Sequence, residues 1–75
     1  MKETISAAAL ASFVRVHNRL PPPATDIQMR WQFAVSGFPP SALGPMREAE
    51  DRTRSWTIAG GGEIIVAHGR MRIAP

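Results

Sequence analysis

Residues 27–35 constrain the fold of this chain most, because their apolar side chains fall at every second position. A β-strand sends successive side chains to opposite faces of a sheet, so this alternation predicts a half-buried antiparallel strand with Arg30 on its polar face. The expected buried face carries Ile27, Met29, Trp31, Phe33 and Val35. The rest of the chain would then serve to cover that face.

The same segment also fits a helix, since several of its apolar residues are three or four positions apart. These residues are Ile27, Trp31, Ala34 and Val35. With residues 26–36 as a helix, the chain would have three helices and a C-terminal β-hairpin, a winged-helix-like arrangement. The two alternatives imply different functions.

Two helices are expected elsewhere in the chain. Residues 4–20 carry an apolar stripe at spacings of three and four, with Thr4 as N-cap and three prolines at 21–23 as the stop. The stripe comprises Ile5, Ala9, Phe13, Val16 and Leu20. Residues 45–54 predict a short surface helix, because Pro45 suits a first helical position and two acid–base pairs follow at a spacing of four. These pairs are Glu48 with Arg52 and Glu50 with Arg54.

The chain after Ser55 is rich in β-forming residues. Residues 56–59 and 63–67 flank three glycines, which is typical of a hairpin. His68 and Gly69 then form either a tight turn, with residues 70–74 as a further strand, or a bulge in one long strand. The predicted fold is therefore a single α+β domain in the order αβαββ. It has two layers, an antiparallel sheet of three or four strands with the N-terminal helix on one face and a short second helix.

Seventy-five residues without cysteine limit the ways in which the fold can be stabilised. Disulfides and thiolate metal sites are excluded, so self-association as a homodimer or binding to a larger partner would add stability. No stretch approaches the roughly 20 apolar residues of a membrane span. We expect a cytoplasmic protein, with both tryptophans, Trp31 and Trp56, in its core.

Catalytic and cofactor motifs are missing from the sequence. The two histidines, His17 and His68, belong to no metal-binding spacing, and no GxSxG motif surrounds a serine. Glycines 60–62 lack the Lys-Ser or Lys-Thr that a phosphate-binding loop requires. The acidic residues near position 50 alternate with arginines, as on a solvated surface. We therefore expect no enzyme, no cofactor and no metal.

Basic residues supply the best functional indication in a chain whose formal charge is +3. On a strand, alternate positions share one face, and on a helix, residues four apart share one edge. The predicted partner-binding residues are Arg15, Arg19, Arg30, His68, Arg70 and Arg72. Such a patch suits a partner's carboxylates or phosphates.

These features predict a small non-enzymatic protein that binds another protein, as an accessory factor or inhibitor. Phages and mobile elements encode many regulators of this size, anti-CRISPR proteins among them, and the likeness is one of size alone. The alternative is a basic DNA- or RNA-binding regulator. In its winged-helix version, residues 26–36 would be the recognition helix and the glycine hairpin the wing.

Overall fold

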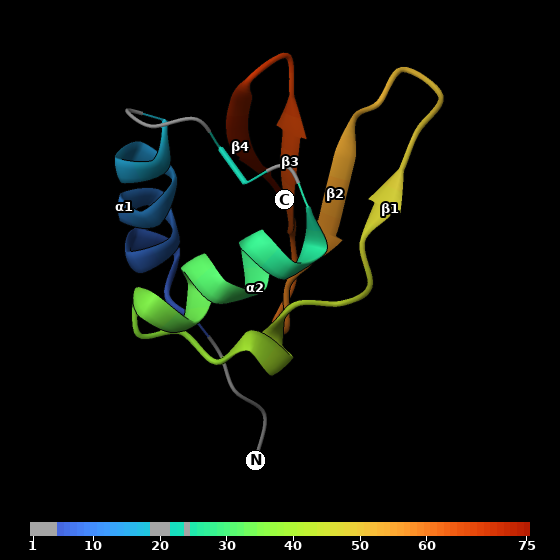
Figure 1. The fold of residues 1–75 in the computed structure, drawn as a ribbon. Helices are drawn as coiled ribbons and strands as arrows, with labels where there is room; N and C mark the ends of the chain where they lie inside the picture. Colours follow the sequence, from blue (N-terminus) through green and yellow to red (C-terminus); the bar gives the residue numbers. More distant parts are fainter. Residues whose placement is uncertain (1–4, 19–21, 24) are drawn as a thin grey trace.

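The computed structural model describes residues 5–18, 22–23 and 25–75, in which two helices lie on one face of a four-stranded antiparallel sheet (Figure 1). The elements are α1 (Ala7–His17), α2 (Asp26–Val35), the 3-10 turn η1 (Pro40–Ala42), β1 (Arg47–Glu48), β2 (Arg54–Thr57), β3 (Glu63–Ala67) and β4 (Arg70–Ala74). The strands lie in the order β1-β2-β3-β4, each antiparallel to its neighbour. The predicted α+β class and antiparallel sheet are confirmed.

Residues 27–35 form most of helix α2, so the strand predicted there is wrong. A capping box starts the helix: Thr25 Oγ1 accepts a hydrogen bond from Gln28 N–H at 3.1 Å, and Gln28 Oε1 accepts one from Thr25 N–H at 3.2 Å. These bonds satisfy backbone donors that the first turn of a helix otherwise leaves unpaired. The helical alternative is correct for this segment, but the sheet has four strands instead of a single C-terminal hairpin.

The helix predicted over residues 45–54 is also wrong, because this segment contains strand β1 and the turn into β2. Asp51 Oδ1 accepts a hydrogen bond from Thr53 N–H at 3.0 Å, and Arg52 adopts a left-handed backbone with φ of 70°. These features reverse the chain and end any helix. Glu48 then pairs with Arg54 across the strands, with its Oε2 3.1 Å from the arginine Nε.

Helix α1 is shorter than predicted and begins after Ser6, whose Oγ accepts a hydrogen bond from Ala9 N–H. Thr4 and Leu20 lie outside the described residues. The loop at glycines 60–62 joins β2 to β3 as expected. His68 and Gly69 have φ values of 53° and 72°, which is the backbone of a two-residue type I′ turn, so the turn alternative is correct.

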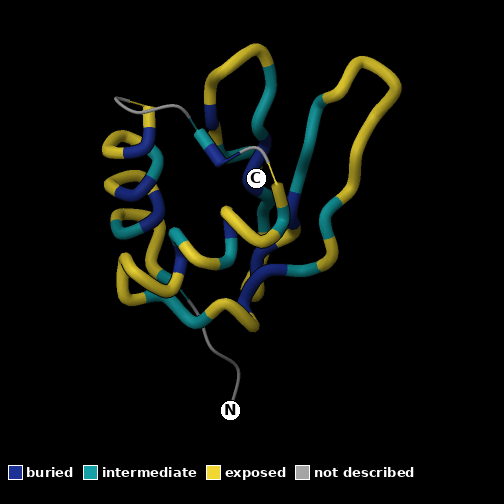
Figure 2. The backbone as a smooth tube through the Cα atoms, in the orientation of Figure 1, coloured by how far each residue is buried: buried dark blue, intermediate teal, exposed yellow. Residues whose placement is uncertain are grey.

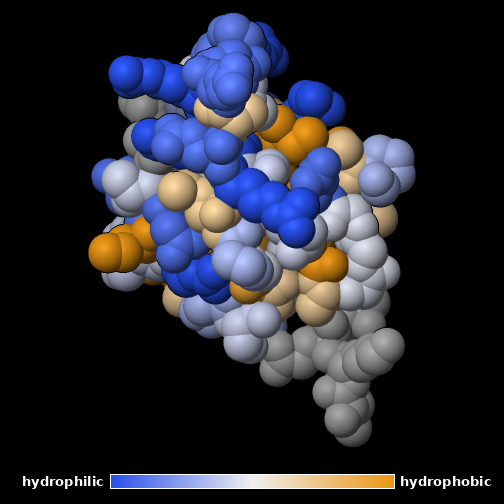
Figure 3. Space-filling view, turned by 90° about the vertical axis from the view of Figure 1, so that its right-hand side faces the viewer, coloured by the Kyte–Doolittle hydropathy of each residue, from blue (hydrophilic) through white to orange (hydrophobic). Residues whose placement is uncertain are grey.

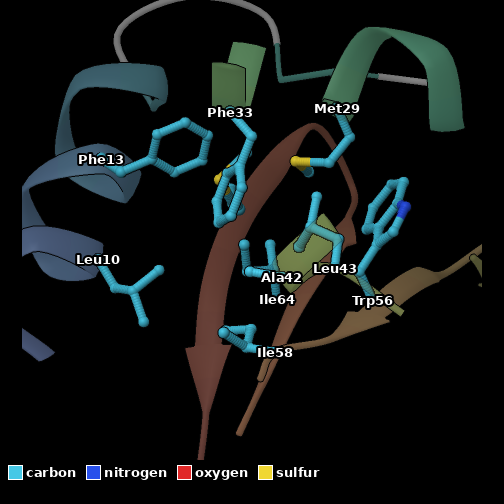
Figure 4. Close-up of a cluster of buried hydrophobic side chains, with 10 residues drawn as sticks. Leu10, Phe13, Met29, Phe33, Ala42, Leu43, Trp56, Ile58 and Ile64 are labelled. Carbon is cyan, nitrogen blue, oxygen red and sulfur yellow. The ribbon is translucent and has the colours of Figure 1, made fainter. Parts of the chain in front are cut away.

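The core lies between the two helices and the sheet (Figures 2 and 4). Its four fully buried large side chains are Met29, Phe33, Trp56 and Ile64. The rings of Phe13 and Phe33 join α1 to α2 in an edge-to-face pair with centroids 5.2 Å apart. The prediction of a core position is confirmed for Trp56 and wrong for Trp31, which is 62% exposed.

Asp26 and Arg30 fix helix α2 to the sheet and to the segment that follows the helix. Asp26 Oδ1 accepts a hydrogen bond from the indole Nε1 of buried Trp56 at 2.8 Å, and Asp26 Oδ2 lies 3.0 Å from Arg30 Nε. Arg30 also donates to the carbonyls of Pro40, Leu43 and Gly44. Its guanidinium is therefore engaged within the fold.

Candidate partner-binding surfaces

Helix α2 carries a row of large apolar side chains on the face that points away from the core. Ile27, Trp31 and Val35 are spaced by four residues and are 80%, 62% and 63% exposed. We call these three residues the α2 stripe. Met29 and Phe33 of the same helix are fully buried and pack in the core. The residues of the α2 stripe therefore contribute little to the core and stay exposed.

The polar residues of α2 are held by contacts within the chain. Asp26 and Arg30 neutralise each other, and these are the only charged residues of the helix. Gln28 closes the capping box, and Gln32 Oε1 lies 2.9 Å from Nε2 of His17. The α2 stripe therefore lies on a helix whose charges are already paired.

His17 is the buried polar residue that ties α1 to α2. Its Nδ1 lies 2.8 Å from the carbonyl oxygen of Phe13, and its Nε2 lies 2.9 Å from Oε1 of Gln32. Its ring also packs against the Phe13 ring, with the centroids 4.1 Å apart. Both ring nitrogens are thus occupied by structural contacts. No group of three or more histidines, aspartates or glutamates in the described residues is arranged to hold a metal ion.

The second surface is a groove between α1 and β4. It has a volume of about 510 Å³ and is lined by Ala11, Val14, Arg15, Asn18, Arg70, Met71, Arg72 and Ile73. We call it the α1–β4 groove. It brings together three of the predicted site residues, Arg15, Arg70 and Arg72, although Arg15 is more than 50 positions away from the other two in sequence. The two ion pairs of the described residues involve other arginines, so these three are unpaired there.

The remaining predicted site residues do not line this groove. Arg30 lies on α2 and is engaged by Asp26 and by backbone carbonyls. His68 is exposed in the β3–β4 turn, and its charge contributes to lowering the pKa of Asp51, which the hydrogen bonds from Thr53 lower most. Arg19 lies outside the described residues.

The side of the molecule that carries β1 and the β1–β2 hairpin is mostly hydrophilic (Figure 3). A shallow polar hollow there is lined by Glu48, Ala49, Glu50, Arg52 and Arg54. The acidic residues near position 50 therefore belong to a charged surface, as the sequence predicts. Among the described residues, neither helix is long and apolar enough to cross a membrane.

Sequence reasoning missed the α2 stripe because it assigned Ile27, Trp31 and Val35 to a buried strand face. One signal could have found it. Thr25 and Gln28 form the Thr-x-x-Gln pattern of a capping box, and a helix starting there places the three apolar residues on one edge. No protein-family model matches this sequence, and no curated protein or solved structure is significantly similar to it.

Proposed function

We propose that this chain is a small non-enzymatic binding protein that acts in the cytoplasm through protein–protein interaction, as an accessory factor or inhibitor. The observation that carries the proposal is the exposed α2 stripe. Helices that bind in grooves of partner proteins present an apolar face of this kind, with large apolar residues about one turn apart. Tryptophan is also among the residues that dominate binding energy at interfaces.

The size of the α2 stripe favours a different protein over a second copy as its occupant. A buried aromatic side chain contributes about 150–250 Å², so the three partly exposed residues offer roughly 400 Å² per molecule. Two copies packed stripe to stripe would bury about 800 Å² in total, the scale of a lattice contact, and stable interfaces bury about 1,200–2,000 Å². A partner groove covers the flanks of the helix as well and reaches that range.

The chemistry of the occupant follows from the paired charges of α2. A partner surface with an apolar floor and a neutral polar rim is complementary to the α2 stripe and its flanking glutamines. Nucleic acid is a poor match for this helix, since its exposed face is apolar and Arg30, the arginine expected near base edges, already bonds to three carbonyls. We therefore rank the nucleic-acid alternative below a protein partner.

A comparative capture experiment tests the proposal. The wild-type chain, Trp31→Gln and Val16→Gln are immobilised and exposed to the same host lysate, and recovered proteins are then purified and titrated individually. Val16 is the matched control, because it is a 52% exposed apolar residue on α1. The proposal predicts one stoichiometric partner that Trp31→Gln loses, Val16→Gln retains, and that binds the purified chain with a negative heat-capacity change.

Two outcomes contradict it. One is the absence of any protein whose recovery depends on Trp31. The other is a purified wild-type chain that sediments as a dimer at micromolar concentration and becomes a monomer when Trp31 is replaced, since a second copy would then occupy the α2 stripe.

A further inference from the structure

Strand β4 is an edge of the sheet, and its backbone is only partly covered. At Met71, the side chain of Asn18 acts as a strand would: its Nδ2 donates to the Met71 carbonyl and its Oδ1 accepts from the Met71 N–H, both at 2.9 Å. These bonds show that the Met71 backbone groups point away from β3.

The register extends this conclusion along the strand. Met71 faces Val66 and Ile73 faces Ile64 across the β3–β4 pair. Backbone groups alternate in direction along an antiparallel strand, so the N–H and C=O of Ile73 point to the same open side as those of Met71. In the described part of the chain no hydrogen bond occupies these two groups of Ile73. The α1–β4 groove lies on this side, with Ile73 in its wall.

The side chains around the edge have a matching alternation. Met71 and Ile73 share the face that packs toward α1, where Ala11 and Val14 line the same groove. Arg70 and Arg72 alternate with them and so lie on the opposite face of the sheet, the face away from α1 and α2 (Figure 1). A strand added at this edge would meet apolar groups on one face and, on the other, two arginines that form no ion pair with any described residue.

We propose that the α1–β4 groove binds an extended acidic segment of another protein, which adds to β4 as a fifth strand. The segment lies beside Ile73, beyond the Met71 groups that Asn18 occupies, and its backbone bonds to Ile73. One carboxylate lies opposite Arg72, another reaches Arg70 from the end of the segment, and its small apolar side chains lie toward Val14. A second copy of β4 does not fit this edge, because its own arginines would face Arg70 and Arg72. This inference concerns a site separate from the α2 stripe and does not depend on it.

Fluorescence anisotropy with a defined probe tests the proposal. The probe is the labelled peptide Gly-Ser-Glu-Val-Glu-Val-Glu-Ser, and the control peptide carries lysine in place of each glutamate. The expected result is saturable binding of the acidic peptide alone. Replacing Arg70 and Arg72 together by alanine should weaken binding about two- to thirtyfold, the range for two exposed ion pairs.

Arg47→Ala is the matched control for charge. Arg47 is exposed on β1, at the opposite edge of the sheet, so its removal should change the affinity less than about twofold. Absence of saturable binding up to about 1 mM peptide overturns the proposal. So does equal weakening by Arg47→Ala, which would indicate attraction by net charge only.

Amide hydrogen exchange separates strand addition from other modes of binding. Bound peptide should slow exchange of the Ile73 amide at least about tenfold and leave the Met71 amide, which Asn18 already bonds, nearly unchanged. An Ile73 amide that exchanges at the same rate in the peptide complex overturns strand addition. A labelled single-stranded oligonucleotide is titrated in parallel. If the oligonucleotide binds and the acidic peptide does not, the groove is a nucleic-acid surface and the proposal fails.

Discussion

Replacing Asp26 by alanine should destabilise the fold more than any other single change on the surface of α2. Asp26 lies at the first position of the helix, where a negative charge also interacts favourably with the helix dipole. Its carboxylate accepts the indole N–H of Trp56, whose side chain is fully buried, and pairs with Arg30. Alanine removes all three interactions.

The magnitude follows from each contact in turn. Leaving the Trp56 N–H without a partner costs about 1–3 kcal/mol. Loss of the helix-dipole interaction costs about 0.3–1 kcal/mol, and the exposed pair with Arg30 about 0.3–0.5 kcal/mol. Because the Asp26 side chain is 39% exposed, water replaces part of what is lost. We expect the free energy of unfolding to fall by about 2–3 kcal/mol, most of it from the Trp56 hydrogen bond.

The effect should depend on pH in a defined direction. The hydrogen bond from Trp56, and then that from Arg30, hold the pKa of Asp26 below its ordinary value. A carboxyl group with a lowered folded pKa stabilises the fold above its unfolded pKa of about 3.9 and loses that contribution as the pH falls through the folded pKa. The difference in unfolding free energy between wild type and Asp26→Asn should therefore shrink below about pH 4.

Urea denaturation followed by far-ultraviolet circular dichroism measures both effects. Asp26→Asn is the control for shape, since its amide oxygen can still accept the Trp56 N–H. It should lose less stability than Asp26→Ala at pH 7. A loss under about 1 kcal/mol for Asp26→Ala, with an unchanged denaturant slope, would refute the assigned role of the Trp56 hydrogen bond.

Further predictions concern the loop at Gly62 and the contact between the helices. A Cβ at Gly62, whose φ is 85°, would lie 2.9 Å from the Ala74 carbonyl oxygen, whereas one at Gly69, whose φ is 72°, would meet no atom within 4 Å. Urea denaturation should show a loss of about 1–2 kcal/mol for Gly69→Ala and a larger one for Gly62→Ala; equal losses would contradict the steric argument. His17→Leu should lower the unfolding free energy by about 1–2 kcal/mol, and a double-mutant cycle with Gln32→Ala should reveal coupling between the two side chains.

The sequence predicts the fold class and the strands after Ser55 for clear physical reasons. Three glycines and the His68–Gly69 pair are strong turn signals, and the β-branched residues between them suit a sheet. Trp56 on β2 and Ile64 on β3 lie opposite each other and are both fully buried. The pairing of β1 with β2 could not be predicted, because β1 has two residues and lacks an apolar pattern.

Alternation of apolar residues gives the wrong secondary structure for the segment from Thr25 to Val35. Its apolar residues occupy every second position, so both a strand and a helix account for part of the pattern. The helix buries only Met29 and Phe33 and leaves the other three exposed, an arrangement that a search for the largest buried face rejects. The capping residues decide the outcome, because they act on the backbone irrespective of which side chains are buried.

The proximity of the basic residues was predicted in part, and their role in binding a partner stays a prediction. Arg15, Arg70 and Arg72 do line one groove, because β4 packs beside α1. Arg30 lies elsewhere, because it belongs to helix α2 and not to a strand. The open backbone of Ile73 could not be derived from composition, because it depends on the register of β4 and on the position of Asn18.

The central claim is that the α2 stripe binds a partner protein and contributes little to the fold. Calorimetric titration of the purified partner with wild type and Trp31→Gln, at equal unfolding midpoints, tests it most directly. We predict an affinity loss of about thirtyfold or more, as for an interface residue worth at least about 2 kcal/mol. Equal affinity for the two proteins, or a Trp31→Gln chain that no longer folds, would contradict the claim.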